Sequence, residues 1–304
     1  MFVARPPVVP SGPHDLHLVR AGRRTFTGPA RFLDDSENRA RVGEYLADMG
    51  RPYGRDVPVS LFGEPPFPGL GHSYGEMAAA VIGSVVPAEE PADLLVLAFS
   101  VHDLRPGRQT AGYLSHITPG EPVAFAVCDQ GSAAAFSGLQ MACAYAASAG
   151  IQRVLLVVAE QAALPYESPA ALPSRHRAVA MLYTSDPSKD DASAIGPARV
   201  TGIRQHPGVA PGEAAALADA GLAELAAGQP AAGLVLSAAA AAVWPAPARP
   251  TRAAPPGQPG TDVWWELIDE LGRPDAPDPL VLADYDPRLR YLCLAAFRTG
   301  PRAG

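Results

Sequence analysis

The chain has 304 residues, of which 48% are hydrophobic and 18% are charged, and its formal net charge is −7. This composition predicts a globular protein with a large core, built as one domain or as two fused halves. The acidic balance argues against a nucleic-acid partner, because phosphate binding needs a basic surface.

The cysteines and the apolar runs indicate a compartment. Cys128, Cys143 and Cys293 are widely spaced, which predicts a reducing environment without a disulfide framework. The N-terminus shows no apolar run behind a basic start, and no segment reaches the roughly 18–20 apolar residues of a membrane helix. We therefore expect a cytoplasmic protein with no membrane partner.

The first part of the chain alternates helix and strand patterns. In chain order these predict a strand at 15–26, a helix at 34–49, a short strand at 57–62, a helix at 72–86, a buried strand at 93–99 and a helix at 109–116. Apolar residues at 123–127 then predict a strand buried on both faces. A turn at 129–131 leads into a helix at 132–148, whose small side chains suit a position between sheets.

The later part continues this order. Strands are predicted at 154–158, 178–184 and 199–205, followed by a helix at 211–228 and a buried strand at 233–237. A Pro-rich loop covers 246–260, a helix covers 261–271, and strands at 279–283 and 291–297 form a closing hairpin. The pattern is that of a layered α/β protein.

The unit at 122–161 resembles the N-terminal half of a ketoacyl synthase III, a thiolase-fold condensing enzyme. In that family a nucleophilic cysteine lies in the first turn of a buried helix, and a later strand ends near an acidic residue. The helix register puts Ser132 at the cysteine position, with Gly131 and Ala133 as alternatives because the preceding turn is one residue longer. Glu160 falls at the acidic position. A weaker similarity extends over about 76–298.

This resemblance implies a thiolase-like α-β-α-β-α layered fold of two related halves. The first half covers residues 1–205 and the second, shortened half covers 206–304. The sequence contains no visible internal repeat, so the duplication rests on the resemblance alone. The family forms dimers whose sheets join, and we expect the strand at 154–158 to lie at that junction.

The family's chemistry is incomplete in this chain. The resemblance implies a thiolate at a helix N-terminus, a His and an Asn, and two backbone N–H groups that hold an oxyanion. No His follows His206 and no Asn follows Asn38. The closing turn, Gly-rich in the family, contains Pro287, which has no N–H, between acidic neighbours that oppose an oxyanion. Decarboxylative condensation is therefore not expected.

Several residues remain as candidates for other chemistry. Ser132 is a helix cap or a nucleophile, and as a nucleophile its hydroxyl needs a base within hydrogen-bond reach. His102 lies in the loop after the strand that ends near Ser100 and is the candidate base. Cys128 is expected in the core, with a displaced nucleophile as the alternative. Glu160 is either a base or the partner of a backbone turn.

No metal and no cofactor are predicted. No Cys or His pair has metal-ligand spacing, and no Gly-rich phosphate loop is followed by Lys. An acyl thioester of an acyl carrier protein or of CoA is the expected substrate. The basic cluster at 175–177 and the pair Arg105 and Arg108 suit a solvated surface, or alternatively contacts with an acyl carrier protein.

Three functions compete at this stage. The favoured one is a divergent ketoacyl synthase III-like protein of a specialised acyl or polyketide pathway, a catalytically degenerate subunit that pairs with an active ketosynthase or with itself. The alternative is an acyltransferase with Ser132 as nucleophile and His102 as base. The third is an α/β protein unrelated to this family.

Overall fold

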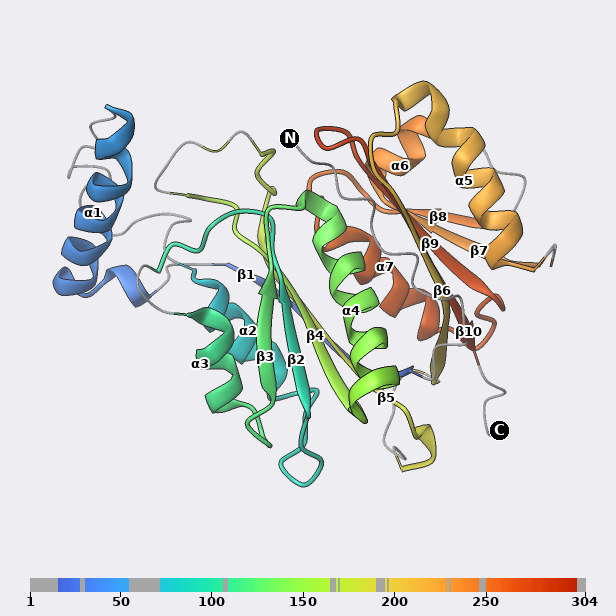
Figure 1. The fold of residues 1–304 in the computed structure, drawn as a ribbon, viewed down its shortest axis with the longest axis horizontal. Helices are drawn as coiled ribbons and strands as arrows, with labels where there is room; N and C mark the ends of the chain where they lie inside the picture. The colour runs from blue at the N-terminus through green and yellow to red at the C-terminus, as the bar shows by residue number, and fades with distance from the viewer. Residues whose placement is uncertain are drawn as a thin grey trace.

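The computed structural model describes residues 16–27, 31–54, 72–105, 109–164, 168, 170–189, 195, 197–227, 229, 231–245 and 250–299. Within them the strands form one mixed ten-stranded sheet (Figure 1). In hydrogen-bonding order the strands are β3 (Val123–Val127), β2 (Leu94–Ala98), β4 (Arg153–Glu160), β5 (His176–Thr184), β1 (His17–Phe26), β6 (Ala198–His206), β10 (Tyr291–Thr299), β9 (Leu280–Asp286), β7 (Gly233–Leu236) and β8 (Thr251–Ala253).

The sheet consists of two halves with the same internal order. From one edge of the sheet to its centre, the first five strands lie in the order 3-2-4-5-1. From the other edge to the centre, the last five lie in the corresponding order, 8-7-9-10-6. Among the described strands, the sheet is continuous between the halves through two residue pairs of β1 and β6, His17 with Arg199 and Leu18 with Ala198. The strand order therefore carries the duplication that the sequence did not reveal. The boundary between the two halves at 205/206 stays a prediction. In the second half, β6 occupies the central position that β1 occupies in the first half.

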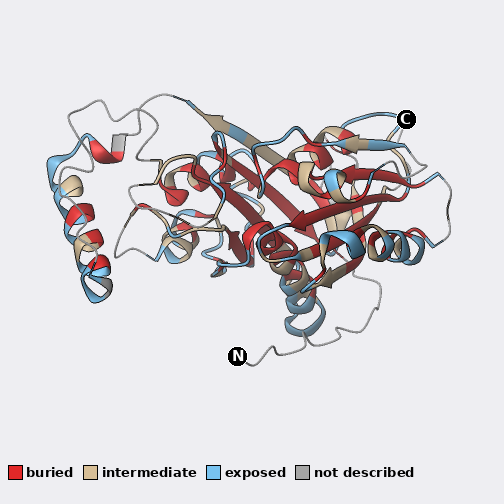
Figure 2. Ribbon diagram, turned by 90° about the horizontal axis from the view of Figure 1, so that it is seen from above, coloured by how far each residue is buried: buried red, intermediate tan, exposed pale blue. Residues whose placement is uncertain are grey.

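Helices form three layers around these halves. The helices are α1 (Ser36–Gly50), α2 (Tyr74–Ile82), α3 (Thr110–Ile117), α4 (Ala134–Ala149), α5 (Pro211–Leu225), α6 (Ala238–Val243) and α7 (Asp262–Leu271). Helices α4 and α7 lie side by side in one core cluster with side chains of both sheet halves. Helices α2 and α3 cover the outer face of the first half, and α5 and α6 cover that of the second. The result is the α-β-α-β-α layering of the thiolase fold, with buried strands at its centre (Figure 2).

Small side chains allow α4 to occupy the middle layer. Its Gly138 lies so close to the sheet that an added Cβ would be 3.1 Å from side-chain atoms of Val96 and Leu156. Nearby on the same helix, Phe136 packs on Trp264 of α7 with ring centroids 4.9 Å apart. The Ala- and Gly-rich sequence thus brings α4 against the sheet while a single aromatic pair fills the space between the two central helices.

Helix starts follow the local sequence. Asp35 caps α1 by accepting from the Glu37 backbone N–H at 2.8 Å. At α2, the Ser73 hydroxyl accepts from Glu76 N at 3.2 Å, and the Glu76 carboxylate accepts from Ser73 N at 3.3 Å. This capping box satisfies two N–H groups that would otherwise have no partner. The predicted strand at 57–62 lies outside the described residues.

Two expectations about the sheet are wrong. The strand at 123–127 is not buried on both faces: β3 is an edge strand that pairs only with β2 among the described strands, and Val123 is 63% exposed. The strand at 154–158 cannot join two sheets, because β4 is already paired with β2 on one side and β5 on the other. A short apolar run is compatible with either position, so the sequence alone did not distinguish them.

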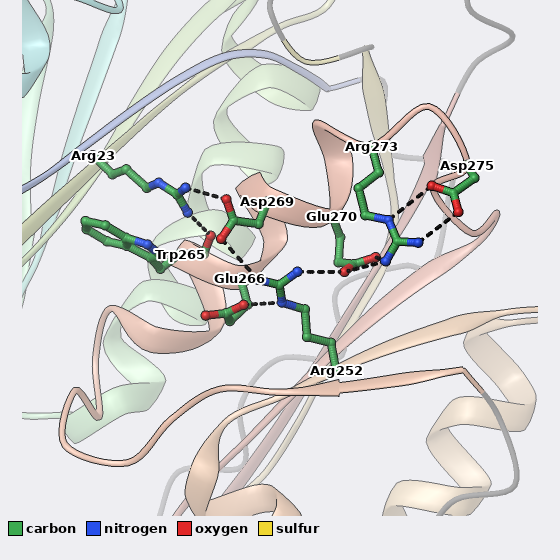
Figure 3. Close-up of polar contacts among 8 residues, drawn as sticks. All are labelled: Arg23, Arg252, Trp265, Glu266, Asp269, Glu270, Arg273 and Asp275. Carbon is green, nitrogen blue, oxygen red and sulfur yellow. Dashed lines mark hydrogen bonds and ion pairs between the residues drawn. The ribbon is translucent and has the colours of Figure 1, made fainter.

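The predicted Pro-rich loop also contains a strand. Residues Thr251–Ala253 form β8, which pairs in parallel with β7. Its Arg252 extends to the face of α7 that points away from α4, where three carboxylates gather (Figure 3). The carboxylates that contact this guanidinium are Glu266, Asp269 (3.2 Å) and Glu270 (3.1 Å). Arg23 of β1 also pairs with Asp269, so this ion-pair cluster connects both sheet halves to α7.

Candidate functional site

A cavity of about 270 Å³ lies between the starts of α4 and α7 and the carboxyl ends of three strands. Glu160 is the last residue of β4, Ser237 follows β7, and Asp284 and Asp286 belong to the end of β9. The carboxyl ends of parallel strands and the starts of helices commonly form ligand sites in α/β proteins. The fold therefore places the cavity where the resemblance puts the family's active site.

Ser132 lines this cavity and lies in the 3-10 turn Gly131–Ala133 that precedes α4. It is 7% exposed. Its hydroxyl donates to the Asp284 carboxylate, 152 residues further along the chain. The hydroxyl is therefore not a helix cap, and the capping interpretation of Ser132 is wrong.

The backbone N–H of Ser132 also has a partner. It donates to Asp286 Oδ2 at 3.2 Å, while Asp286 Oδ1 accepts from the N–H groups of Arg288 (3.0 Å) and Leu289 (2.8 Å). Gly131 makes room for this carboxylate, since a Cβ at that position would lie 1.8 Å from Asp286 Oδ2. The N–H that the resemblance assigns to an oxyanion thus already donates to a carboxylate.

Asp284 and Asp262 are buried beside Ser132. Burial raises the pKa of Asp284 to about 6, although hydrogen bonds from Ser132 and Ser237 act against the shift. Asp262 accepts from Val263 N at 2.6 Å and from Ala238 N at 3.4 Å. Burial, and next the charge of Asp284, raise the pKa of Asp262 to about 9. At neutral pH Asp262 therefore keeps its proton, while Asp284 beside it is mostly ionised.

Glu160 is another buried acid that lines the cavity. Its carboxylate accepts from Gly260 N at 2.6 Å, Thr261 N at 3.1 Å and the Thr261 hydroxyl at 2.5 Å. Burial raises the pKa of Glu160 to about 7, against these hydrogen bonds. Of the two expectations for Glu160, the turn partner describes its contacts: it holds the segment that leads into α7.

The histidines lie elsewhere. His102 is exposed and is not among the residues that line the cavity, so the structure does not bring it to Ser132. The rings of His72 and His176 pack in a tilted arrangement with centroids 4.7 Å apart, and His176 Nδ1 accepts from Ala162 N at 3.1 Å. Among the described residues, no histidine lines this cavity.

Cys128 also differs from the expectation. It lies half-buried at the end of β3 rather than in the core, and its thiol donates to Asp129 at 3.6 Å. Burial, and next the Asp129 charge, raise the pKa of Cys128, which disfavours the reactive thiolate. Its role as a displaced nucleophile finds no support in this environment.

The acids that surround Ser132 were not identified from the sequence. Asp262 looks like a helix cap beside Thr261, and Asp284 and Asp286 look like turn residues that oppose an oxyanion. Their side chains converge only because α7 and β9 come together at the start of α4. A usable signal existed in β9, where acidic residues alternate at 284 and 286 at the end of an apolar run.

In the described part of the chain, no group of three or more His, Cys, Asp or Glu residues has an arrangement that could hold a metal ion. The helices of that part are all too short or too polar to span a membrane. The cavity acids therefore do not form a metal-ligand set.

Sequence comparison gives no relatives, because neither a protein-family model nor a curated protein matches the chain. Solved structures do match. A variant of OleA from Xanthomonas campestris is 15% identical with a TM-score of 0.60, and the match covers 93% of this chain and 98% of that one. AbyA1, a tetronic acid condensing enzyme, is 14% identical with a TM-score of 0.59 over 93% of this chain and 99% of its own. The acyltransferase ChlB3 is 16% identical with a TM-score of 0.57 over 94% and 98%. The chain therefore has the thiolase fold that these proteins share.

Proposed function

We propose that this protein is a non-catalytic thiolase-fold subunit of a specialised acyl or polyketide pathway, which pairs with an active ketosynthase. The observation that carries the proposal is the Asp286 carboxylate on the Ser132 backbone N–H, at 3.2 Å. In acyl transfer this type of N–H stabilises the negative oxygen of the tetrahedral intermediate, and losing one such donor typically costs about 100- to 1000-fold in rate. Here the donor is occupied by a group of the same charge as that intermediate.

The surroundings of Ser132 support the same conclusion. A thioester oxygen would have to displace Asp286 Oδ2 from the Ser132 N–H, although two further N–H groups anchor that carboxylate through Oδ1, and then lie beside Asp284. Like charges at short range in a buried site are strongly unfavourable. The second N–H of the family's site is missing as well, because position 287 is proline.

The partner would dock on the edge of the sheet at β3. Val123 is 63% exposed there, and Phe125 of β3 packs on Tyr145 of α4 with ring centroids 5.7 Å apart. Tyr145 and Met141, on the same helix face, are 39% and 40% exposed. An unpaired strand edge beside exposed apolar side chains is suited to pairing with another strand. We call Val123, Phe125, Met141 and Tyr145 the β3 surface.

Co-expression tests this proposal. The chain should co-purify with a tagged ketosynthase encoded beside it, and the complex should elute as one species in size-exclusion chromatography. Val123→Lys should abolish co-purification, because a charged residue on an edge strand opposes strand pairing. The matched control Leu172→Lys changes an exposed apolar residue at the cavity and should leave association intact. A stable homodimer that never binds the ketosynthase would refute the heteromeric subunit.

One observation favours a second function, an acyltransferase that uses Ser132. Its hydroxyl already donates to Asp284, whose pKa is raised to about 6 by burial. A carboxylate with a pKa near the working pH is an effective general base for a hydroxyl nucleophile. In this alternative Asp284 takes the place that the sequence assigned to His102, and an acyl thioester is the donor.

Intact-protein mass spectrometry distinguishes the two functions. The acyltransferase would gain one acyl group from an acyl-CoA, Ser132→Ala would not, and labelling would increase with pH through about 6 as Asp284 ionises. The non-catalytic subunit would remain unlabelled from about pH 5 to about pH 9, a range that spans the pKa of Asp284. Cys128→Ala is the matched control, since it removes a half-buried thiol four residues before Ser132 that does not line the cavity.

A further inference from the structure

The polar side of the cavity has far more acceptors than donors. The buried carboxylates that line it are Glu160, Asp262, Asp284 and Asp286. None of them forms an ion pair with another described residue. The buried serine hydroxyls of the lining, of Ser132 and Ser237, both donate to Asp284, and the Tyr285 hydroxyl donates to Val209 O. The lining cation is Arg288, which is exposed.

Two amide side chains add acceptors without partners. Gln161 and Gln258 line the same cavity and are 1% and 3% exposed. The Gln161 amide nitrogen donates to His72 O at 2.8 Å and to Asp103 Oδ1 at 2.7 Å, which fixes its orientation. The Gln258 nitrogen donates to Gly257 O at 2.6 Å and to the Ser174 hydroxyl at 3.2 Å. In both side chains the oxygen has no hydrogen-bond partner among the described residues.

An unpaired buried acceptor destabilises the fold, so such groups call for a partner. The missing partner has to donate hydrogen bonds, and next to carboxylates without an ion-pair partner it should carry positive charge. A carboxylate or phosphate ligand has the opposite chemistry and is excluded by the same groups. The apolar wall of the cavity includes Ala170, Leu172, Ala238, Ala239 and Pro259.

We infer that this cavity binds a small aliphatic ammonium ion, with its nitrogen among the Gln161, Gln258, Asp262 and Glu160 acceptors and its hydrocarbon part against the apolar wall. The cavity volume of about 270 Å³ limits the ligand to a small molecule, since pockets that bind drug-sized ligands measure roughly 300–1000 Å³. Binding goes beyond the proposed subunit role and does not depend on it.

Proton release should accompany this binding. The raised pKa values of Asp262 (about 9) and Glu160 (about 7) mean that the empty cavity holds protons near neutral pH. An ammonium group favours the ionised carboxylates and expels those protons. The charged groups that face the site are Glu160, Asp262, Asp284, Asp286, Arg177 through its field on Glu160, and Arg288 at the exposed side.

Calorimetric titration of the purified full chain, without partner or thioester, tests the inference. At about pH 8, n-butylamine should bind at least about tenfold more tightly than 1-butanol of the same shape, because charge-assisted hydrogen bonds are the stronger ones. Butyrate should give no binding heat. Repeating the butylamine titration near neutral pH in two buffers of different ionisation enthalpy should reveal proton release.

Variants locate the site. Asp262→Asn should weaken butylamine binding at least about tenfold without changing 1-butanol binding. Gln258→Leu, which removes an unpartnered acceptor, should act in the same direction. The control Asp275→Asn, an exposed carboxylate outside the cavity, should have no effect. Equal affinity for butylamine and 1-butanol, binding without proton release, or unchanged binding by both cavity variants would overturn the inference. Loss of ketosynthase association alone would bear only on the proposed function.

Discussion

Asp262 shows how a single buried acid couples folding to pH. In the folded chain burial raises the pKa of Asp262 from 3.8 to about 9. The folded state therefore keeps a proton that the unfolded state loses near pH 4. The unfolded state binds fewer protons between these values, so this residue makes the protein less stable as pH rises from about 4 to about 9.

Asp262→Asn should remove this dependence. The variant's advantage over the wild type in the free energy of unfolding should therefore grow as pH rises above about 4. Between about pH 5 and about pH 8 this advantage should increase by at least about 1 kcal/mol, since one pKa unit corresponds to about 1.4 kcal/mol. Denaturant unfolding at the two pH values measures this difference.

Asp275→Asn serves as the comparison for this residue. Its carboxylate is exposed and paired with Arg273, which lowers its pKa, so its contribution to stability has the opposite sign. It should gain nothing at the higher pH. A variant Asp262→Asn whose advantage over the wild type does not grow between the two pH values would contradict the assignment of Asp262 as a protonated buried acid.

At the level of single residues, the sequence predicted some features of the site and did not predict others. Ser132 was identified because the helix register after a turn is a local property. Its hydrogen-bond partner was not, because Asp284 is 152 residues away and its side chain could equally face solvent in a hairpin turn. Contacts across so long a stretch of sequence are fixed by the packing of whole elements, so the local sequence does not identify the partner.

Helix α7 carries three carboxylates on one face at 266, 269 and 270, and its stability depends on the cations around them. Arg252 of β8 contacts all three, and Arg23 of β1 contacts Asp269 (Figure 3). Like charges at helical spacing repel one another. The network therefore attaches α7 to β8 and β1 while it compensates this repulsion.

Arg252→Met should lower the free energy of unfolding by about 1–2 kcal/mol at low salt, more than an isolated surface pair contributes. In about 1 M NaCl the loss should shrink, because the screening length falls to about 3 Å. Arg41→Met, which removes the exposed pair with Glu37 on α1, is the matched control and should cost about 0.3–0.5 kcal/mol. Equal effects of the two variants would show that the α7 cluster does not act as a network.

At the scale of the whole molecule, the two halves differ in the edge strand that each contributes to the described sheet. The sheet ends in two edge strands, and β8 at one end is only three residues long. The other end, β3, is longer and lies beside the exposed side chains of the β3 surface. The Val123→Lys experiment belongs to this scale, because it tests whether the longer edge is completed by a second chain.

The sequence by itself determined most elements, the position of Ser132 at the start of a central helix, and the absence of a histidine and an asparagine after His206. These are properties of residue type and of periodicities within a single segment. Only the tertiary structure decided that β3 is an edge, that the Ser132 N–H meets Asp286, and that acids from β4, α7 and β9 share one cavity with unpaired amide oxygens. An apolar run or an acidic residue has the same local pattern in either setting. Its environment is chosen when distant elements pack together, because burial and pairing are properties of the assembled layers rather than of any one segment.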